Sequence, residues 1–306
     1  MIYRLKYKIF GTKKISDLSQ IETENPIRDI CYVDNFGIVF STGHCLGLIK
    51  EDGSCIFPWK SRKVEKPEET EETEDYEFVE DEDINRPFFG ELSSVTYDSK
   101  SKQVFLGENG GRNVQEIDLE RNYTYPLFEM QSASFIERLL KNVRNDAFVY
   151  VAPVCRERFY IMPPDLSKCF FYNNAEIDHV VGDGKYRFSI GSDAVNSSIG
   201  YPSGILFVDN KLYISDGINN VVRVIDHGSI SVYCGRPKTK MLNNPSKMVV
   251  SKNIMFIMCK DSIRTCIFSR KVLNEKPFYE SKSIVYITAN KDGALYILEE
   301  QYAECS

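Results

Sequence analysis

Histidine is the side chain best suited to acid–base chemistry near neutral pH, and this 306-residue chain has only three. They are His44, His179 and His227, and the last two directly follow an aspartate. A catalytic base and the carboxylate that orients it come from separate parts of the chain, so these pairs do not indicate a triad. No G-x-S-x-G, H-E-x-x-H or phosphate-binding G-x-x-x-x-G-K motif is present. We therefore expect structural or surface roles for the histidines and assign no catalytic residue.

The nine cysteines are odd in number and include no C-x-x-C pair, so neither a disulfide framework nor a zinc site is indicated. Most lie in apolar runs such as DICYVD, where a free cysteine behaves as a small buried side chain. No apolar run approaches the roughly 18 residues that would cross a bilayer, and the start, MIYRLKYKIF, lacks the apolar core of a secretory signal. We expect a protein of the cytoplasm or another reducing intracellular compartment.

The formal charge of −6 is unevenly distributed along the chain. Residues 65–83 contain twelve acidic residues and one lysine, a charge of −11, which leaves the rest of the chain at +5. Such a segment buries too little apolar surface to fold by itself, so we predict an acidic loop insertion over residues 60–86. It is either a solubility spacer or an arm that binds a basic partner. The candidate contact residues are Glu71, Glu72, Tyr76, Phe78, Asp81 and Glu82.

Residues 201–235 read as four short strands, GILFV, KLYIS, VVRVID and ISVYC, separated by turn residues. Alternating apolar positions bounded by such turns predict a meander of hairpins. Residues 105–118 align without a gap on 213–226, which places Glu108 where Asp216 stands. Further copies begin at Asp29, Phe148, Pro245 and Ser283, so six units can be counted.

Residues 180–235 resemble an NHL repeat together with the glycine-rich connection that precedes it. The matching features are Pro202-x-Gly204-Ile, Leu-Tyr-x-x-Asp216, Asn219-Asn220, a Val-Arg-Val strand and a closing glycine. The resemblance implies an all-β, six-bladed β-propeller of NHL-like repeats. Other units depart from the pattern, with Thr42 in place of the aspartate and Gly111-Arg112 in place of the two asparagines.

The final unit supplies only two strands, whereas residues 2–10 form an alternating strand without a unit of their own. Because closing a ring removes exposed sheet edges, we predict that the N-terminal strand completes the sixth blade and that residues 1–306 form a single domain. Ser134 and Glu137 have capping-box spacing before an apolar pair. We therefore predict one short inserted helix, over residues 131–145.

The repeated acids Asp216 and Glu108 could in principle do acid–base work. A residue required once per blade is better explained as an acceptor for backbone N–H groups in the turn between strands, and we give Asn219 and Asn220 the same structural role. Gluconolactonase-like relatives of this architecture hold a divalent metal at the axis, so that alternative stays open. The sequence itself assigns no cofactor and no metal ligand.

We expect a non-enzymatic platform whose loops bind protein partners in a larger assembly. The alternatives are a metal-assisted hydrolase or lyase with an axial site and a single-stranded RNA-binding NHL propeller. The short basic cluster RPKTK at 236–240 is too small to favour nucleic acid. We expect it to contact a protein, as we do the basic residues at 156 and 158. The basic candidates are Arg156, Arg158, Lys238 and Lys240.

Overall fold

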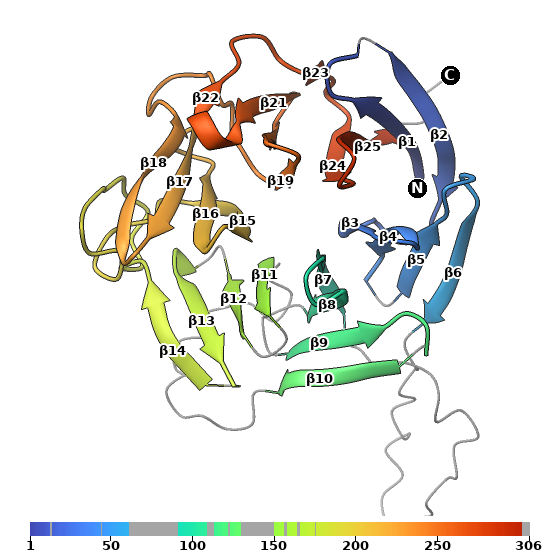
Figure 1. The fold of residues 1–306 in the computed structure, drawn as a ribbon, viewed down its shortest axis with the longest axis horizontal. Helices are drawn as coiled ribbons and strands as arrows, with labels where there is room; N and C mark the ends of the chain where they lie inside the picture. The colour runs from blue at the N-terminus through green and yellow to red at the C-terminus, as the bar shows by residue number, and fades with distance from the viewer. Residues whose placement is uncertain are drawn as a thin grey trace, which may run out of the picture.

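The chain folds into six antiparallel sheets arranged as blades around a central axis (Figure 1). The computed structural model describes residues 1–12, 14–43, 45–60, 91–108, 113–121, 123–129, 150–155, 158–163, 166–174 and 176–301. The predicted helix at 131–145 and all but the first residue of the predicted acidic insertion lie outside these ranges. The prediction of an all-β, six-bladed propeller is confirmed.

Each blade is ordered from the axis outwards. Blade 1 contains β3 (Asp29–Val33), β4 (Gly37–Ser41), β5 (Cys45–Ile49) and β6 (Cys55–Lys60), and blade 2 contains β7 (Leu92–Asp98), β8 (Gln103–Glu108), β9 (Asn113–Asp118) and β10 (Tyr123–Glu129). Blade 3 contains β11 (Tyr150–Cys155), β12 (Arg158–Met162), β13 (Cys169–Asn173) and β14 (Glu176–Val181), and blade 4 contains β15 (Pro202–Val208), β16 (Lys211–Asp216), β17 (Val221–Asp226) and β18 (Ser229–Gly235). Blade 5 contains β19 (Met248–Ser251), β20 (Ile254–Cys259), β21 (Ser262–Ile267) and two short outer strands, β22 (Val272–Leu273) and β23 (Tyr279–Glu280).

Blade 6 is built from both ends of the chain. Its inner strands are β24 (Ile284–Ala289) and β25 (Ala294–Gln301), and its outer strands are β1 (Ile2–Ile9) and β2 (Ile15–Glu22). The whole length of β1 pairs with β25, from Ile2 opposite Gln301 to Ile9 opposite Ala294. Closure of the ring by the N-terminal strand is therefore confirmed. The second N-terminal strand, β2, has no counterpart in the sequence analysis.

Local turn chemistry fixes the hairpins of the clearest repeat. Asp209 and Asn210 join β15 to β16, and both have positive φ, 50° and 57°. Two consecutive residues with positive φ form the turn whose twist matches that of paired strands, and aspartate and asparagine tolerate this conformation better than most residues.

The hydrophobic core lies between neighbouring blades. Val39 of blade 1 packs in one cluster with Leu106 of blade 2. Tyr3 and Leu298 of blade 6 pack with Phe40 of blade 1. Each blade packs one face against the preceding blade and the other face against the following blade. The N-terminal strands, which belong to blade 6, are therefore part of the hydrophobic core.

Strand direction gives the ring two faces. The connections between blades, such as residues 182–201 and 236–247, arrive where each innermost strand begins, and the turn between the second and third strands returns to the same side. We call this side the connection face. The turns between the first and second strands lie on the opposite face.

The described cysteines, eight of the nine, are all free thiols, and five are buried. Burial raises the pKa of Cys31 and Cys169, and it raises the pKa of Cys259 to about 12. No helix in the described part of the chain is long and apolar enough to cross a membrane.

Candidate functional site

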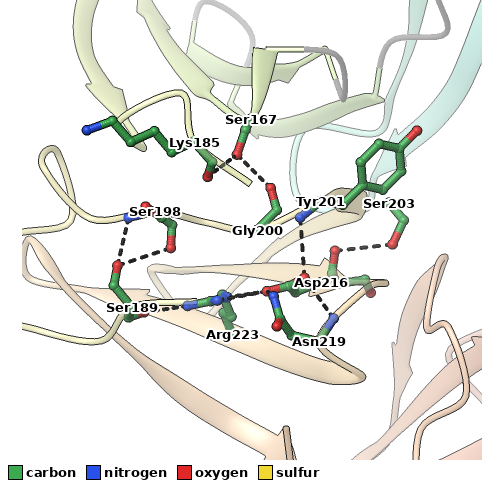
Figure 2. A network of polar contacts seen from close by, with 11 residues as sticks. Ser167, Lys185, Ser189, Ser198, Gly200, Tyr201, Ser203, Asp216, Asn219 and Arg223 are labelled. Atoms are coloured by element: carbon green, nitrogen blue, oxygen red, sulfur yellow. Dashed lines mark hydrogen bonds and ion pairs between the residues drawn. The ribbon is translucent and has the colours of Figure 1, made fainter. Parts of the chain in front are cut away.

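The repeat acid Asp216 forms a fully buried ion pair at the end of β16. Arg223 of β17 donates from Nε and Nη2 to Asp216 Oδ2, at 2.9 and 2.7 Å, and neither side chain is exposed (Figure 2). Asp216 Oδ1 accepts the backbone N–H of Asn219 at 3.2 Å and that of Tyr201 at 3.3 Å. Both carboxylate oxygens are thus occupied by groups of the fold.

The same network holds the long connection between blades 3 and 4. Arg223 Nη1 donates to the carbonyl of Ser189 at 2.6 Å, and the guanidinium lies 4.5 Å from the centre of the Phe188 ring. Gly200 has φ +75°, and a Cβ at this position would lie 2.1 Å from Asp216 Oδ2. Only glycine lets the connection pass so close to the buried carboxylate. Residues 182–201 are therefore fixed to blade 4 (Figure 2).

Equivalent pairs occur in two other blades. In blade 2, Gln115 Nε2 donates to Glu108 Oε1 at 2.7 Å. In blade 6, hydrogen bonding assigns the side-chain oxygen of Gln301 to the position that faces Arg4. This oxygen accepts from Arg4 Nη2 at 2.8 Å and from Arg4 Nε at 3.0 Å. The repeat alignment indicates Glu108 as a structural residue but does not by itself point to Gln115. The spacing could have done so, because Gln115 follows Glu108 by the same number of residues that separates Arg223 from Asp216.

On the connection face, Asn220 links the turn between β16 and β17 to the connection between blades 4 and 5. It has φ +57°, and its Oδ1 accepts the backbone N–H of Asn244 at 2.9 Å. Lys238 and Lys240 lie exposed in the same connection as Asn244, between blades 4 and 5. The structure thus places these two candidate partner-binding residues on the connection face.

Arg158 is exposed at the start of β12, and the turn before β12 joins the first and second strands of blade 3. It therefore lies on the opposite face. Strand direction thus separates Arg158 from the blade connections, one of which includes residues 61–86 of the predicted acidic insertion. The other candidates, Glu71, Glu72, Tyr76, Phe78, Asp81, Glu82 and Arg156, lie outside the described residues.

Three exposed side chains, Tyr186, Tyr201 and Ile218, form a patch beside the buried network, which we call the Tyr–Ile patch. The rings of Tyr186 and Tyr201 are 5.9 Å apart. The N–H of Gly217 donates to the Tyr201 carbonyl at 3.0 Å, which brings the turn carrying Ile218 alongside. Ile218 is 65% exposed. Sequence reasoning did not identify this patch, although an isoleucine in the turn Gly-Ile-Asn-Asn is a recognisable anomaly.

A cavity of about 290 Å³ occupies the axis and is lined by all six innermost strands. Near the connection face, Lys247 forms an ion pair with Asp29 and donates to the carbonyl of Ile30 at 2.5 Å. Asp29 also accepts the N–H of Ile30 at 2.9 Å and that of Val95 at 3.1 Å. Burial raises the pKa of Asp29, and the Lys247 ammonium opposes this shift. This group links the innermost strands of blades 1, 2 and 5.

The described histidines lie away from this cavity. His179 Nδ1 is 2.9 Å from Asp178, and both side chains are about half exposed. His227 Nδ1 is 2.6 Å from Asp226, and the His227 side chain is 96% exposed. His44 lies outside the described residues. Among the residues that the structure describes, no group of three or more histidine, cysteine, aspartate or glutamate side chains is arranged to hold a metal ion.

No protein-family model matches the chain, and no curated protein matches it. Solved structures of six-bladed propellers do. A streptogramin B lyase has 12% identity and a TM-score of 0.54, with 97% of this chain and 98% of that chain covered. A catalytically inactive virginiamycin B lyase from Staphylococcus aureus with quinupristin has 11% identity and a TM-score of 0.51, covering 96% and 87%. A nidogen–laminin complex has 10% identity and a TM-score of 0.52, covering 97% and 98%. At these identities the likeness shows the fold, that of a six-bladed β-propeller.

Proposed function

We propose that this propeller is a non-enzymatic platform that binds a protein partner through its connection face. The observation that carries the proposal is the Tyr–Ile patch, whose large exposed side chains project from backbone that hydrogen bonds to Asp216 anchor on both sides. Because this backbone is ordered before binding, less conformational entropy is lost on association. Tyrosines of this kind are common among the residues that dominate binding energy.

Charge on the connection face adds a second element to the proposal. Lys238 and Lys240 are exposed in the connection that the Asn220–Asn244 hydrogen bond joins to the turn carrying Ile218. The connection between blades 1 and 2 carries the −11 segment, and its described end, Glu91, pairs with Arg28 at 3.2 Å. We propose that the acidic segment recruits a basic region of the same partner. Such charges chiefly change the association rate and its dependence on salt.

The proposal predicts that one surface substitution removes the partner. Ile218→Asp should lower the amount of partner recovered with the tagged protein from its own cells by at least roughly tenfold, because a central apolar contact is replaced by a charge. Val272→Asp is the matched control, since Val272 is also exposed (48%) but lies on β22 of blade 5. Quantitative mass spectrometry of both captures provides the comparison. Equal recovery of every captured protein by the two variants would contradict the proposal.

We also propose that the chain is a divergent NHL-repeat propeller. Blade 4 supports this assignment, because Asp216, Asn219 and Arg223 of the motif form one hydrogen-bonded network. Pro202 and Gly204 of the motif lie at the start of its innermost strand.

One finding favours a second candidate, an enzyme of the lyase or hydrolase type. Two of the similar structures are lyases of the same architecture. A lyase site in this chain would use the axial cavity, where Asp29 and Lys247 are the ionisable pair.

A further inference from the structure

Exposed cations flank the Tyr–Ile patch along the connection between blades 3 and 4. Lys185 and Arg187 are the chain neighbours of Tyr186, and both are exposed. The Lys185 side chain is 57% exposed, and its ammonium lies 3.9 Å from Asp183 Oδ2. An ion pair this long and this exposed to water is weak. The Lys185 ammonium therefore remains accessible to a charge on a partner.

A third lysine lies beside these two cations. A Cβ at Gly184 would lie 3.1 Å from Cε and 4.0 Å from Nζ of Lys168, so this ammonium lies next to the backbone that leads to Lys185. The Ser167 hydroxyl is 3.1 Å from the Lys185 carbonyl oxygen and 2.6 Å from that of Gly200 (Figure 2). Gly200 precedes the second tyrosine of the patch. The backbone that carries the cations is thus joined to the backbone that carries the patch.

The connection between blades 4 and 5 adds further positive charge. Residues 236–240, RPKTK, contain three exposed cations and no acid. Later in the same connection, the N–H of Asn244 donates to Asn220, which lies in the turn that carries Ile218. Both connections that are hydrogen-bonded to this turn therefore carry exposed cations on the connection face.

The acids of this region do not neutralise these cations. Asp183 accepts a serine hydroxyl at 2.9 Å, and its side chain is only 19% exposed. Asp193 lies toward the opposite face, because the N–H of the next residue donates at 2.7 Å to Gly228, in the turn between β17 and β18. In blade 5 the exposed Asp261 directly follows the exposed Lys260, so that turn adds no net charge. On the connection face, the exposed charges of the two connections are therefore positive.

The apolar part of the patch favours a peptide over a nucleic acid. Ile218, at 65% exposed, offers no ring on which a base could stack, and stacking contributes much of the energy of single-strand binding. The Arg223 guanidinium, 4.5 Å from the ring centre, already covers one face of Phe188. An apolar side chain of a peptide can pack on Ile218 directly, with carboxylates on either side of it facing the cations.

We propose that the Tyr–Ile patch binds an acidic peptide segment of the partner. One large apolar side chain of the segment packs against Ile218 and the two tyrosines, and flanking carboxylates approach Lys185 and Arg187. The inference rests on the proposed function and specifies the chemistry of the partner at that site. The apolar contact holds the complex, and the charges around it raise the association rate. The partner then carries this acidic segment in addition to the basic region recruited by residues 65–83.

The test selects ligands from a random library of short peptides displayed on phage, with the full chain immobilised. Each selected peptide is measured again with Ile218→Ala, which removes the apolar contact without adding a charge. We expect the peptides that need Ile218 to be enriched in aspartate and glutamate and to contain a large apolar residue. Neutral or basic peptides that need Ile218 would overturn the inference and leave the proposed function in place. Selection of no peptide that needs Ile218 would contradict both.

Charge substitutions test the position of the carboxylates. At low salt, Lys185→Gln/Arg187→Gln should weaken binding of a selected acidic peptide roughly five- to tenfold, the value of two exposed charge pairs. The loss should shrink as salt is added. Lys252→Gln/Lys291→Gln is the matched control, because it removes two exposed lysines from turns on the opposite face. It should leave the affinity unchanged. Equal losses in the two double variants would show an effect of net charge alone and would overturn the inference.

Single-stranded RNA is the competing ligand, and poly(U) labelled with a fluorophore is its probe. Fluorescence anisotropy compares poly(U) with the selected acidic peptides under the same salt conditions. We expect poly(U) to bind more weakly than the peptides. Tighter binding of poly(U), lost in Lys185→Gln/Arg187→Gln and kept in Ile218→Ala, would overturn the inference and identify a nucleic-acid site.

Discussion

The acidic position of the repeat makes different interactions in different blades. In blade 4 the Asp216 carboxylate meets a guanidinium, and the pair is fully buried. In blade 2 the corresponding Glu108 is only partly buried and meets an uncharged amide, that of Gln115. Removing one member of a buried ion pair leaves the other charge without compensation. The blade 4 position should therefore be the more sensitive to substitution.

Asp216→Ala should lower the free energy of unfolding by roughly 3–5 kcal/mol, because Arg223 would remain buried and unpaired. The double variant Asp216→Leu/Arg223→Met should lose less, since it removes both charges and keeps most of the volume. Urea denaturation of the wild type and the variants measures these differences. A single variant as stable as the wild type, or a double variant less stable than Asp216→Ala, would show that the ion pair does not have this role.

The strand β1 is joined to its neighbours by an ion pair of Lys6 as well as by its backbone hydrogen bonds to β25. Lys6 Nζ lies 2.5 Å from Glu299 Oε2 and donates to the Tyr279 hydroxyl at 3.2 Å. Tyr279, on β23 of blade 5, donates to Glu299 Oε1 at 2.8 Å. Burial acts to raise the pKa of Glu299, but hydrogen bonds, that from Lys6 first among them, outweigh burial and hold it below its ordinary value. The network therefore links blade 5 to blade 6.

Acid should weaken this link. A carboxylate whose pKa is lowered on folding stabilises the fold above its unfolded pKa of about 4.3, and this contribution is lost as the pH falls through the folded value. Between pH 6 and pH 3 the Tm of the wild type should therefore fall further than that of Glu299→Gln, which lacks the titrating group. Thermal denaturation across this range measures both slopes. Parallel curves for the two proteins would contradict the prediction.

Strands and turns of the repeat could be predicted from the sequence because their signals are local. The alternation in residues 201–235 and the Asp209-Asn210 turn lie within a few residues of the contacts they specify. The axial pair could not be predicted in this way, because Asp29 and Lys247 are 218 residues apart and meet only when the ring closes. The same reason applies to the pairing of Arg4 with Gln301. The Tyr–Ile patch depends on a long connection whose path no periodicity specifies.

The complete ring explains why both ends of the chain are needed for one core. Innermost strands of neighbouring blades contact each other around the axis, including β24 with β3 and β19 with β24. Blade 6 thus separates blades 5 and 1, and half of its strands come from residues 2–22. Without β1, the long strand β25 would present an unpaired edge, which is a template for association between chains.

Deletion of residues 1–22 should therefore produce a less stable protein that self-associates, because it removes two strands and exposes the edge of β25.

A circular permutant provides the control. Ile2 lies opposite Gln301 in the sheet, so a short glycine–serine linker can join the natural ends, and new ends can be placed between His227 and Gly228 in an exposed turn. The permutant keeps every strand and should remain monomeric, with at most a modest loss of Tm, because loop closure depends weakly on length. Size-exclusion chromatography with light scattering and thermal denaturation compare the two forms. A monomeric deletion variant with the wild-type Tm would show that β1 and β2 do not contribute to the stability of the closed ring. A permutant that aggregates as readily as the deletion variant would show that the position of the chain ends, and not the missing strands, causes the loss.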